Sequence, residues 1–302
     1  MQDRHWQRLD GWYQQQGEHD MKKTFGLAMI VIVWCALAAG GAEPSAPPAV
    51  QPSSQPAKDL TLDLGNNVTM KLVLIPAGKF MMGSPEDEKD RLPDENPHEV
   101  TITKPYYMGV FSVTQAQWTA VMGAGPWKGK DYVKEEATCP ATFISWDDAA
   151  EFCGKFSKTA GRNVRLPTEA QWEYACRAGS KTRFYYGDDP DYSKLGDYAW
   201  YSKNAADGGE KYAHPVGLKK PNDWGLYDMH GNVWQWCSNW YEGSYAHAKE
   251  TDPQGLATGT NRVLRGGSWI YIPRSCRSAI RYGTDPLLRI CSIGFRVVVE
   301  LD

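Results

Sequence analysis

Residues 262–282, RVLRGGSWIYIPRSCRSAIRY, hold the densest group of side chains that could do chemistry. A Gly-Gly pair precedes Ser268, the aromatic residues Trp269 and Tyr271 follow, and a single thiol stands at Cys276. Aromatic walls with one hydroxyl suit a peptide or a small ligand, and a thiolate can act as a nucleophile or a metal ligand. The segment therefore predicts the wall of a pocket for a small molecule, a peptide or a metal.

Other features of the sequence argue against several classes of function. The segment has no G-x-S-x-G elbow, and its Gly-Gly pair precedes no phosphate-loop lysine. The net charge is −3 and the body of the chain has no basic run, so nucleic acid is not expected as a partner. The histidines have no metal-ligand spacing, so an iron site is not predicted, and we expect His98 and His247 to be solvated.

The N-terminal region has the pattern of a secretory signal. Lys22 and Lys23 precede the apolar stretch TFGLAMIVIVWCALAAGGA, which ends in small residues. This pattern predicts a cleaved signal peptide within residues 1–42, and we expect Met21 to be the start. A membrane anchor is the alternative, but the weakly apolar end favours cleavage over a stable membrane span. The sequence thus predicts export to the periplasm or the extracellular space.

The rest of the chain divides into a linker and one domain. Residues 43–60 are rich in Pro and Ser and predict a linker, followed by a domain over residues 61–302. The chain has 13 Trp, 29 Gly and 19 Pro, which predicts a loop-rich fold around an aromatic core. Residues 70–84 predict a β-hairpin that bends at Pro76-Ala77-Gly78, and residues 98–114 are β-rich.

Three helices are predicted from their first residues. Thr114, Ser145 and Thr168 are each followed three positions later by Gln or Asp, which is the pattern of a capping box. Glycines at 123, 161 and 179 are expected to end these helices. Beyond residue 180 only RVLRGGSW and IGFRVVVEL predict strands, so we expect ions or disulfides to hold this long irregular part.

Six sequence blocks occur in an order that resembles a known family. They are LIPAGKFMMGS, ISWDDAAEFC, VRLPTEAQWEYACRAG, GLYDMHGNVWQWCSNWY, VLRGGSW and IGFRV, and they span about residues 70–300. The chain resembles the sulfatase-modifying-factor, or formylglycine-generating-enzyme, family. The resemblance implies a single α+β domain with a C-type-lectin-like fold and little regular secondary structure.

The founding activity of that family is oxidation of a sulfatase cysteine to formylglycine within a Cys-x-Pro-x-Arg peptide. Two enzyme cysteines hold Cu(I), the substrate thiolate joins them, and O₂ is reduced; soft thiolates suit this soft ion. Those cysteines lie three and eight residues after the serine of the Gly-Gly-Ser run. Counted from Ser268, the second position is Cys276, but the first is Tyr271, whose phenol is a poor ligand for Cu(I).

Two outcomes are open for the remaining thiol. Cys237 lies in VWQWC, a segment that lines the same region in the family. A structural disulfide between Cys237 and Cys276 is expected in an exported protein, and a displaced thiol pair that binds copper is the alternative. If the family chemistry or a variant of it persists, Cys276 is the reactive thiol and Ser268 helps to position the substrate.

The resemblance also assigns substrate-binding residues. Trp234, Trp269 and Tyr271 match positions that line the pocket. Trp234 and Trp236 are two apart on a strand-like segment and would share a face, which either lines the pocket or packs in the core. Three arginines either contact an acidic ligand or pair with aspartates: Arg265, Arg277 and Arg281. The charged loop of residues 85–100 is expected to be a solvated surface.

A calcium site is the other implication of the resemblance. The family binds Ca²⁺ with side-chain and backbone oxygens from the segment that matches YDMHGNVWQW. Carried over, the candidate ligands are Asp228, the carbonyls of Gly231 and Val233, and Gln235, where the family commonly has Glu. The alternative is that Asp228 caps a turn and Gln235 packs.

Two hypotheses about function follow. The first is an exported oxidase of protein cysteine that acts on a sulfatase-like or other protein substrate. The second is a non-catalytic module with the same scaffold, which binds a peptide, a glycan or an envelope protein. Tyr271 favours the second hypothesis.

Overall fold

The computed structural model describes residues 59–245 and 251–301. The predicted signal peptide in residues 1–42 lies outside the described residues, as does nearly all of the predicted linker. Strand β1 (Asp59–Asp63) begins two residues before the predicted domain boundary. Within the described ranges, no helix has the length and apolar character needed to cross a bilayer.

A five-stranded antiparallel sheet joins the two ends of the domain. Its C-terminal strand β13 (Val298–Glu300) lies between β5 (Tyr106–Gly109) and β6 (Val164–Arg165). On the other side of β5 are β2 (Thr69–Ile75) and then β1. The last strand is therefore held in the middle of the sheet by hydrogen bonds on both edges.

A four-stranded sheet carries the residues that the sequence singles out. The strand order is β11-β10-β9-β12, with β12 parallel to β9 and the other pairs antiparallel. Two small sheets pair β3 with β4 and β7 with β8. The bounds are β9 (Trp234–Trp240), β10 (Arg262–Arg265), β11 (Arg281–Thr284), β12 (Ile293–Phe295), β3 (Gly78–Met82), β4 (His98–Ile102), β7 (Ala199–Trp200) and β8 (His230–Gly231).

The predicted hairpin over residues 70–84 is wrong, although both of its strands exist. β2 pairs with β1 and β5, whereas β3 pairs with β4. At the predicted bend the chain passes from the five-stranded sheet to the small β3–β4 sheet. Glycine is needed at position 78, because a Cβ there would meet the Tyr174 hydroxyl at 2.3 Å. Local alternation predicts a strand but not its partner, because the partner is set by long-range packing.

All three predicted capping boxes are confirmed. Thr114, Ser145 and Thr168 each accept from the third following backbone N–H, and Gln or Asp at that position bonds back to the cap. They begin α2 (Gln115–Met122), α3 (Trp146–Ala160) and α4 (Glu169–Arg177). α4 ends on left-handed Ala178 rather than on the predicted glycine, which follows it with φ of 90°.

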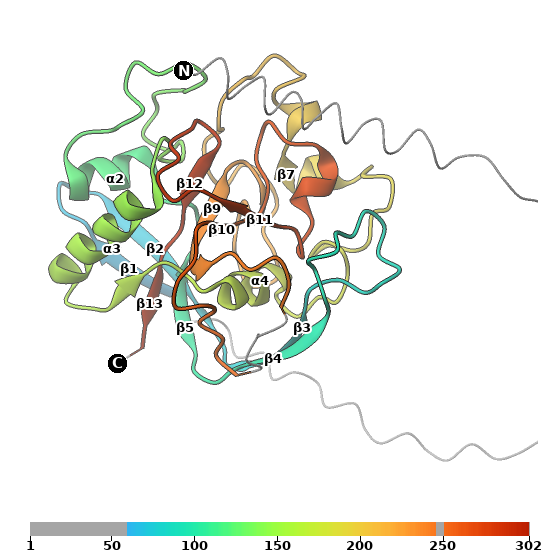
Figure 1. Cartoon of the computed structure of the whole chain (residues 1–302). Helices are drawn as coiled ribbons and strands as arrows, with labels where there is room; N and C mark the ends of the chain where they lie inside the picture. Colours follow the sequence, from blue (N-terminus) through green and yellow to red (C-terminus); the bar gives the residue numbers. More distant parts are fainter. Residues whose placement is uncertain (1–58, 246–250, 302) are drawn as a thin grey trace, which may run out of the picture. The chain divides into compact units, whose positions relative to one another are not determined.

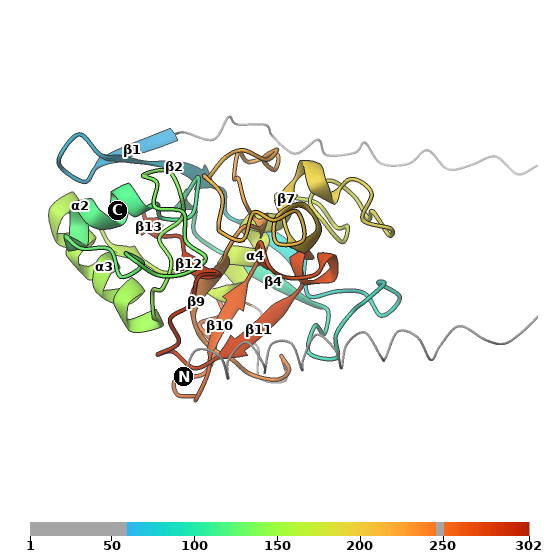
Figure 2. The same cartoon turned by 90° about the horizontal axis from the view of Figure 1, so that it is seen from above.

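The helices lie in different parts of the domain. α2 and α3 lie together on the side opposite β7 in both views (Figures 1 and 2). α4 lies against β3, β9 and β10 (Figure 1). Three short 3₁₀ helices complete the irregular half: η1 (Leu195–Asp197), η2 (Ser202–Asn204) and η3 (Pro273–Cys276).

Buried ion pairs join α4 to the four-stranded sheet. Glu173 accepts from Arg177 Nε at 2.8 Å and from Arg265. Glu169 accepts two hydrogen bonds from Arg281, each 2.8 Å long. The sequence predicts aspartates or an acidic ligand for these arginines, but α4 supplies glutamates from inside the domain. All the paired groups are buried, so each charge depends on its partner.

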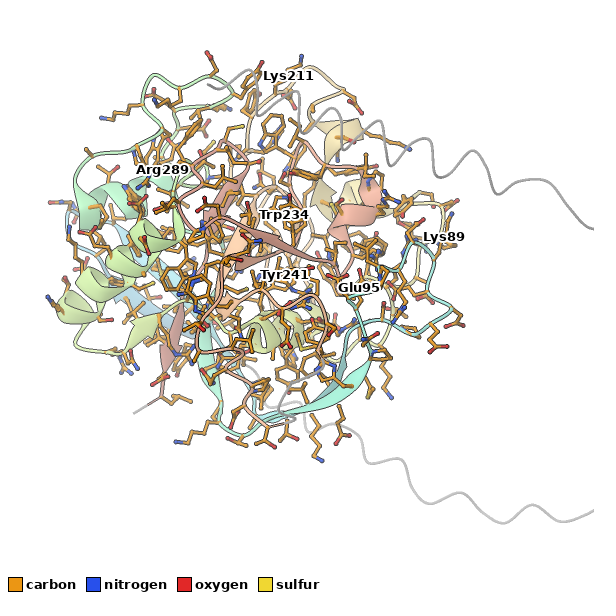
Figure 3. All side chains as sticks on the ribbon, in the orientation of Figure 1. Lys89, Glu95, Lys211, Trp234, Tyr241 and Arg289 are labelled. Atoms are coloured by element: carbon orange, nitrogen blue, oxygen red, sulfur yellow. The ribbon has the colours of Figure 1, made fainter. Side chains whose placement is uncertain are left out.

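The charged segment 85–100 is not simply the solvated surface that its composition predicts. Glu95 is fully buried and accepts from Arg277 at 2.6 and 2.8 Å, and Glu88 accepts from the same guanidinium at 2.7 Å. In Figure 3 Glu95 lies within the crowded interior, whereas exposed Lys89 lies at the margin. The carboxylates turn inward because a buried guanidinium offsets their loss of hydration.

The predicted disulfide between Cys237 and Cys276 is absent. The six cysteines of the described domain are free thiols and all are buried. Cys237 packs in the main core cluster, while Cys276 belongs to a second cluster with Phe184 and Tyr201. Ion pairs rather than disulfides therefore hold the described part of the irregular half.

Removing one buried carboxylate tests this arrangement. We expect Glu173→Gln to lower the free energy of unfolding by about 3–5 kcal/mol, because it removes the carboxylate that the buried Arg265 and Arg177 guanidiniums share. Urea unfolding followed by circular dichroism measures the change. Glu99→Gln is the matched control, because its ion pair with Lys79 is exposed and should contribute little. Equal effects of the two changes would contradict the role given to the buried pair.

Candidate functional site

The Gly266-Gly267 pair makes a left-handed turn that brings the following residues into the interior. The two φ angles are 98° and 75°. A Cβ on Gly267 would meet the Ser275 carbonyl oxygen at 2.5 Å and Cys276 Sγ at 3.0 Å. Glycine is needed here both for the backbone conformation and for the close approach of η3. Ser268, directly after the turn, is fully buried.

The predicted aromatic wall exists, but it is enclosed. Trp234 packs edge-to-face on Tyr271, with ring centroids 5.5 Å apart, and the two residues are 3% and 5% exposed. Trp269 is fully buried, and its indole donates to the Cys291 carbonyl at 3.4 Å. Figure 3 shows Trp234 among densely packed side chains. Trp236 is also fully buried, so the shared face of β9 belongs to the core.

Two buried polar atoms in this wall have no hydrogen-bond partner among the described residues. They are Ser268 Oγ and Trp234 Nε1. An unsatisfied buried donor costs about 1–3 kcal/mol, so such atoms need a water or a ligand group. In the predicted pocket, these are the two polar atoms that no group of the described residues satisfies with a hydrogen bond.

The Cys276 thiol is fully buried in a different cluster from the main core. It packs with Phe184, Leu195 and Tyr201 in the second core cluster. Burial raises the pKa of this thiol well above its ordinary value, so the thiol keeps its proton. A neutral thiol is a weak nucleophile and a weak metal ligand.

A second buried thiol, Cys176, has an imidazole beside it but is not activated by it. His230 is fully buried, its Nδ1 lies 4.0 Å from Cys176 Sγ, and burial lowers its pKa to about 3. It therefore stays neutral and cannot stabilise a thiolate by its charge. No group of three or more His, Cys, Asp or Glu side chains that could hold a metal occurs in the described residues.

The residues predicted to bind calcium are engaged with one another. Gln235 Oε1 accepts from Trp172 Nε1 and from Arg296 Nε, each at 2.7 Å, and Gln235 Nε2 donates to the Asp228 carbonyl at 2.9 Å. An amide oxygen has two lone pairs, and both are used here. Gln235 thus has no oxygen to offer a cation, and a guanidinium already stands beside it.

The remaining predicted ligands do not compensate for this loss. Asp228 is buried and adopts a φ of 55°, and its carboxylate accepts from the Gly217 N–H at 2.9 Å. Gly231 and Val233 are buried and offer only carbonyls. Calcium needs about six to eight oxygen ligands. These residues do not fit the calcium site that the resemblance implies.

A cavity lies elsewhere, in a place that the sequence does not indicate. Its volume is about 220 Å³, and it is bounded by the start of α4, the end of β9 and residues 251–256. Glu169, Glu242 and Asp252 supply three carboxylates, and Arg281 supplies one guanidinium. The lining comes from segments far apart in the chain, so no local motif predicts it.

His98 lies at this cavity and is not the freely solvated residue that we expect from the sequence. Its ring packs on Tyr245, with centroids 4.5 Å apart, and Nδ1 bonds to the Asn96 carbonyl oxygen at 2.9 Å. Its Nε2 is buried and without a partner in the described residues. His247, the other histidine expected to be solvated, lies outside the described residues.

These observations define a single mixed α+β domain with little regular secondary structure. The sequence matches the family model for the sulfatase-modifying factor enzyme 1-like domain over residues 63–301, so the chain belongs to that family. The structure of PvdO from Pseudomonas aeruginosa is similar, with a TM-score of 0.72 and 30% identity, over 80% of this chain and 98% of that one.

Curated relatives include both active and inactive members. The formylglycine-generating enzyme of Streptomyces coelicolor is 35% identical over 199 residues, which is 61% of each chain. The chain thus covers less than two thirds of that enzyme. The bovine protein named inactive C-alpha-formylglycine-generating enzyme 2 is 29% identical, over 78% of this chain and 90% of its own length.

The Glu169–Arg281 pair at the cavity should give stability a specific pH dependence. Burial alone raises the pKa of Glu169, but Arg281 and Arg265 outweigh it and hold the pKa below its ordinary value. The stabilisation is therefore complete above about pH 4.5 and is lost as the pH falls through the lower folded-state pKa.

We expect Glu169→Gln to be much less stable than the wild type at pH 7, with the difference shrinking below about pH 4.5. Urea unfolding at pH 7, 5, 4 and 3 measures both proteins. Glu151→Gln, in an exposed pair with Lys155, is the control. A difference in unfolding free energy that does not change with pH would count against the ion pair.

Proposed function

We propose that this chain is a binding module of the formylglycine-generating-enzyme family, which recognises a protein segment and does not carry out copper-dependent cysteine oxidation. The observation that carries the proposal is the state of the two positions at which the family holds copper. One is Tyr271, a phenol packed on Trp234. The other is Cys276, a neutral thiol enclosed in a separate cluster.

A copper site of the family type needs two thiolates, and the described residues offer one thiol at this place. Cu(I) prefers soft sulfur ligands, whereas a phenol is harder and stays protonated at neutral pH. Cys237 does not supply the missing sulfur, because it packs in the main core cluster and its pKa is raised well above the ordinary value by burial. Loss of activity within the family also has a precedent in the bovine relative named inactive.

A protein ligand is supported by the family and by the size of the cavity. The family is named for modifying a sulfatase, which is itself a protein. The cavity of about 220 Å³ is smaller than the roughly 300–1,000 Å³ of sites that enclose a drug-sized ligand. It is large enough for one long side chain of a partner. Such a partner would lie in the compartment to which the proposed signal peptide delivers this chain.

The charge of the cavity favours a basic side chain. Three carboxylates and one guanidinium line it. Glu169 is neutralised by Arg281, whereas the hydrogen bond that Asp252 accepts from the neutral Thr103 N–H at 2.9 Å offsets no charge, so carboxylates outnumber guanidiniums in the lining. We therefore propose that a Lys or Arg side chain of the partner occupies the cavity, since Arg is also a frequent anchor of interfaces.

The oxidase alternative is tested directly with copper and a target peptide. We expect the mature protein, incubated with Cu(I), O₂ and a Cys-x-Pro-x-Arg peptide, to retain no stoichiometric copper and to form no aldehyde detectable by mass spectrometry. The Streptomyces coelicolor relative serves as the positive control for the assay. Aldehyde formation that is lost in Cys276→Ser would overturn the proposal in favour of the oxidase.

Panning of a random linear peptide library tests the binding role. We expect enriched peptides to carry Lys or Arg at one fixed position, and Glu242→Gln to raise their Kd at least about tenfold, which is about 1.4 kcal/mol of binding free energy. Fluorescence polarisation with synthetic peptides measures Kd. Glu151→Gln is the matched charge control, because Glu151 is an exposed residue of α3. Peptides without a basic position, or an unchanged Kd in Glu242→Gln, would refute this site.

A further inference from the structure

The orientation of the Gln235 amide is fixed by its neighbours. Trp172 Nε1 and Arg296 Nε are donors only, so the atom that they both approach at 2.7 Å must be the amide oxygen. The NH₂ group must then face the Asp228 carbonyl, 2.9 Å away. Gln235 is fully buried at the centre of the four-stranded sheet, between Arg265 of β10 and Gly294 of β12.

The guanidinium beside Gln235 is held by neutral oxygens. Arg296 is fully buried and donates to the carbonyls of Gly109 at 2.7 Å and Tyr227 at 2.7 Å, besides Gln235. No carboxylate lies within ion-pair distance of it in the described residues. Hydrogen bonds of the Arg296 guanidinium and the Gln235 amide therefore join the segment 227–235 to the end of β12 and to β5.

A carboxylate at position 235 would fit this network differently. One oxygen could still accept from Trp172 and Arg296. The second oxygen would stand in place of the NH₂ group and face the Asp228 carbonyl oxygen at about the same separation, with no hydrogen between them. Two oxygens so placed repel each other unless a proton or a cation lies between them, and a proton would leave the carboxyl neutral. Among cations, Ca²⁺ reaches its oxygens at about 2.3–2.6 Å.

We propose that the Gln235 N–H group replaces a bound cation in this chain, so that the fold is independent of calcium, and that Gln235→Glu alone creates a calcium requirement. The amide N–H donates directly to the Asp228 carbonyl oxygen, at the place where a carboxylate oxygen would need an ion between itself and that carbonyl. The carbonyls of Gly231 and Val233 and the Asp228 carboxylate remain nearby in sequence to complete a site in the variant.

The wild-type protein gives the first test. Its melting temperature is measured by differential scanning calorimetry in EDTA and in millimolar CaCl₂, and Ca²⁺ binding is measured by isothermal titration calorimetry. We expect a change of less than about 1 °C, because a ligand that does not bind the native state cannot stabilise it. Stoichiometric Ca²⁺ binding by the wild type, or a lower melting temperature in EDTA, overturns the proposal.

The Gln235→Glu variant gives the second test. We expect it to melt several degrees below the wild type in EDTA, to recover most of the loss in CaCl₂, and to bind one Ca²⁺ per chain. Gln115→Glu is the matched control, since Gln115 is also buried, donates to the Lys134 carbonyl at 2.9 Å and accepts from the Glu136 N–H at 3.1 Å. It should lose stability equally in EDTA and in CaCl₂.

The outcomes of the variant experiment are distinct. Recovery of Gln235→Glu by Ca²⁺ without recovery of Gln115→Glu supports the proposal. Equal behaviour of the two variants, or failure of Gln235→Glu to fold even in CaCl₂, overturns it. None of these readouts depends on enzymatic or peptide-binding activity, so they stand apart from the proposed function.

Discussion

The pairing of buried glutamates with buried arginines is the constraint on which the rest of the structure depends. α4 presents Glu169 and Glu173 to Arg281 and Arg265 on adjacent strands. Glu173 also accepts from the Gly83 N–H at 2.9 Å, so one carboxylate joins three elements. Burying such charges costs several kcal/mol per ion, and the cost is offset only when every partner is in place. The arrangement therefore tolerates little displacement of α4 against the sheet.

Side-chain amides extend the same principle into the irregular half. Asn222 donates to the Ala175 carbonyl at 2.7 Å, at the end of α4, and accepts from the Leu226 N–H at 3.0 Å. The Asn232 side chain bonds to both backbone groups of His214. Its oxygen accepts from the His214 N–H at 2.9 Å, and its NH₂ group donates to the His214 carbonyl at 3.0 Å. These hydrogen bonds take the place of the backbone pairing between strands, because buried backbone groups in a segment without strands still need partners. Long stretches without regular structure can thus be rigid.

The sequence predicts what local chemistry determines and misses what distant partners determine. The capping boxes at Thr114, Ser145 and Thr168 are visible because their hydrogen bonds close within three residues. The partner of β2 and the burial of Glu95 are not visible, since Arg277 lies 182 positions away. The order of the blocks indicates the family, and the same order of blocks puts Tyr271 where the resemblance implies a cysteine. The cavity, built from separate segments, has no such signal.

Two departures from the family pattern have the same physical character. At Tyr271 a phenol stands where a thiolate would bind a soft ion, and it packs on Trp234. At Gln235 an amide stands where a carboxylate would bind a hard ion, and it donates to the Asp228 carbonyl. Each change replaces an anionic ligand with a neutral group whose contacts lie within the protein. We infer that a scaffold that satisfies both positions internally would keep its fold without metal, which agrees with the proposed binding role.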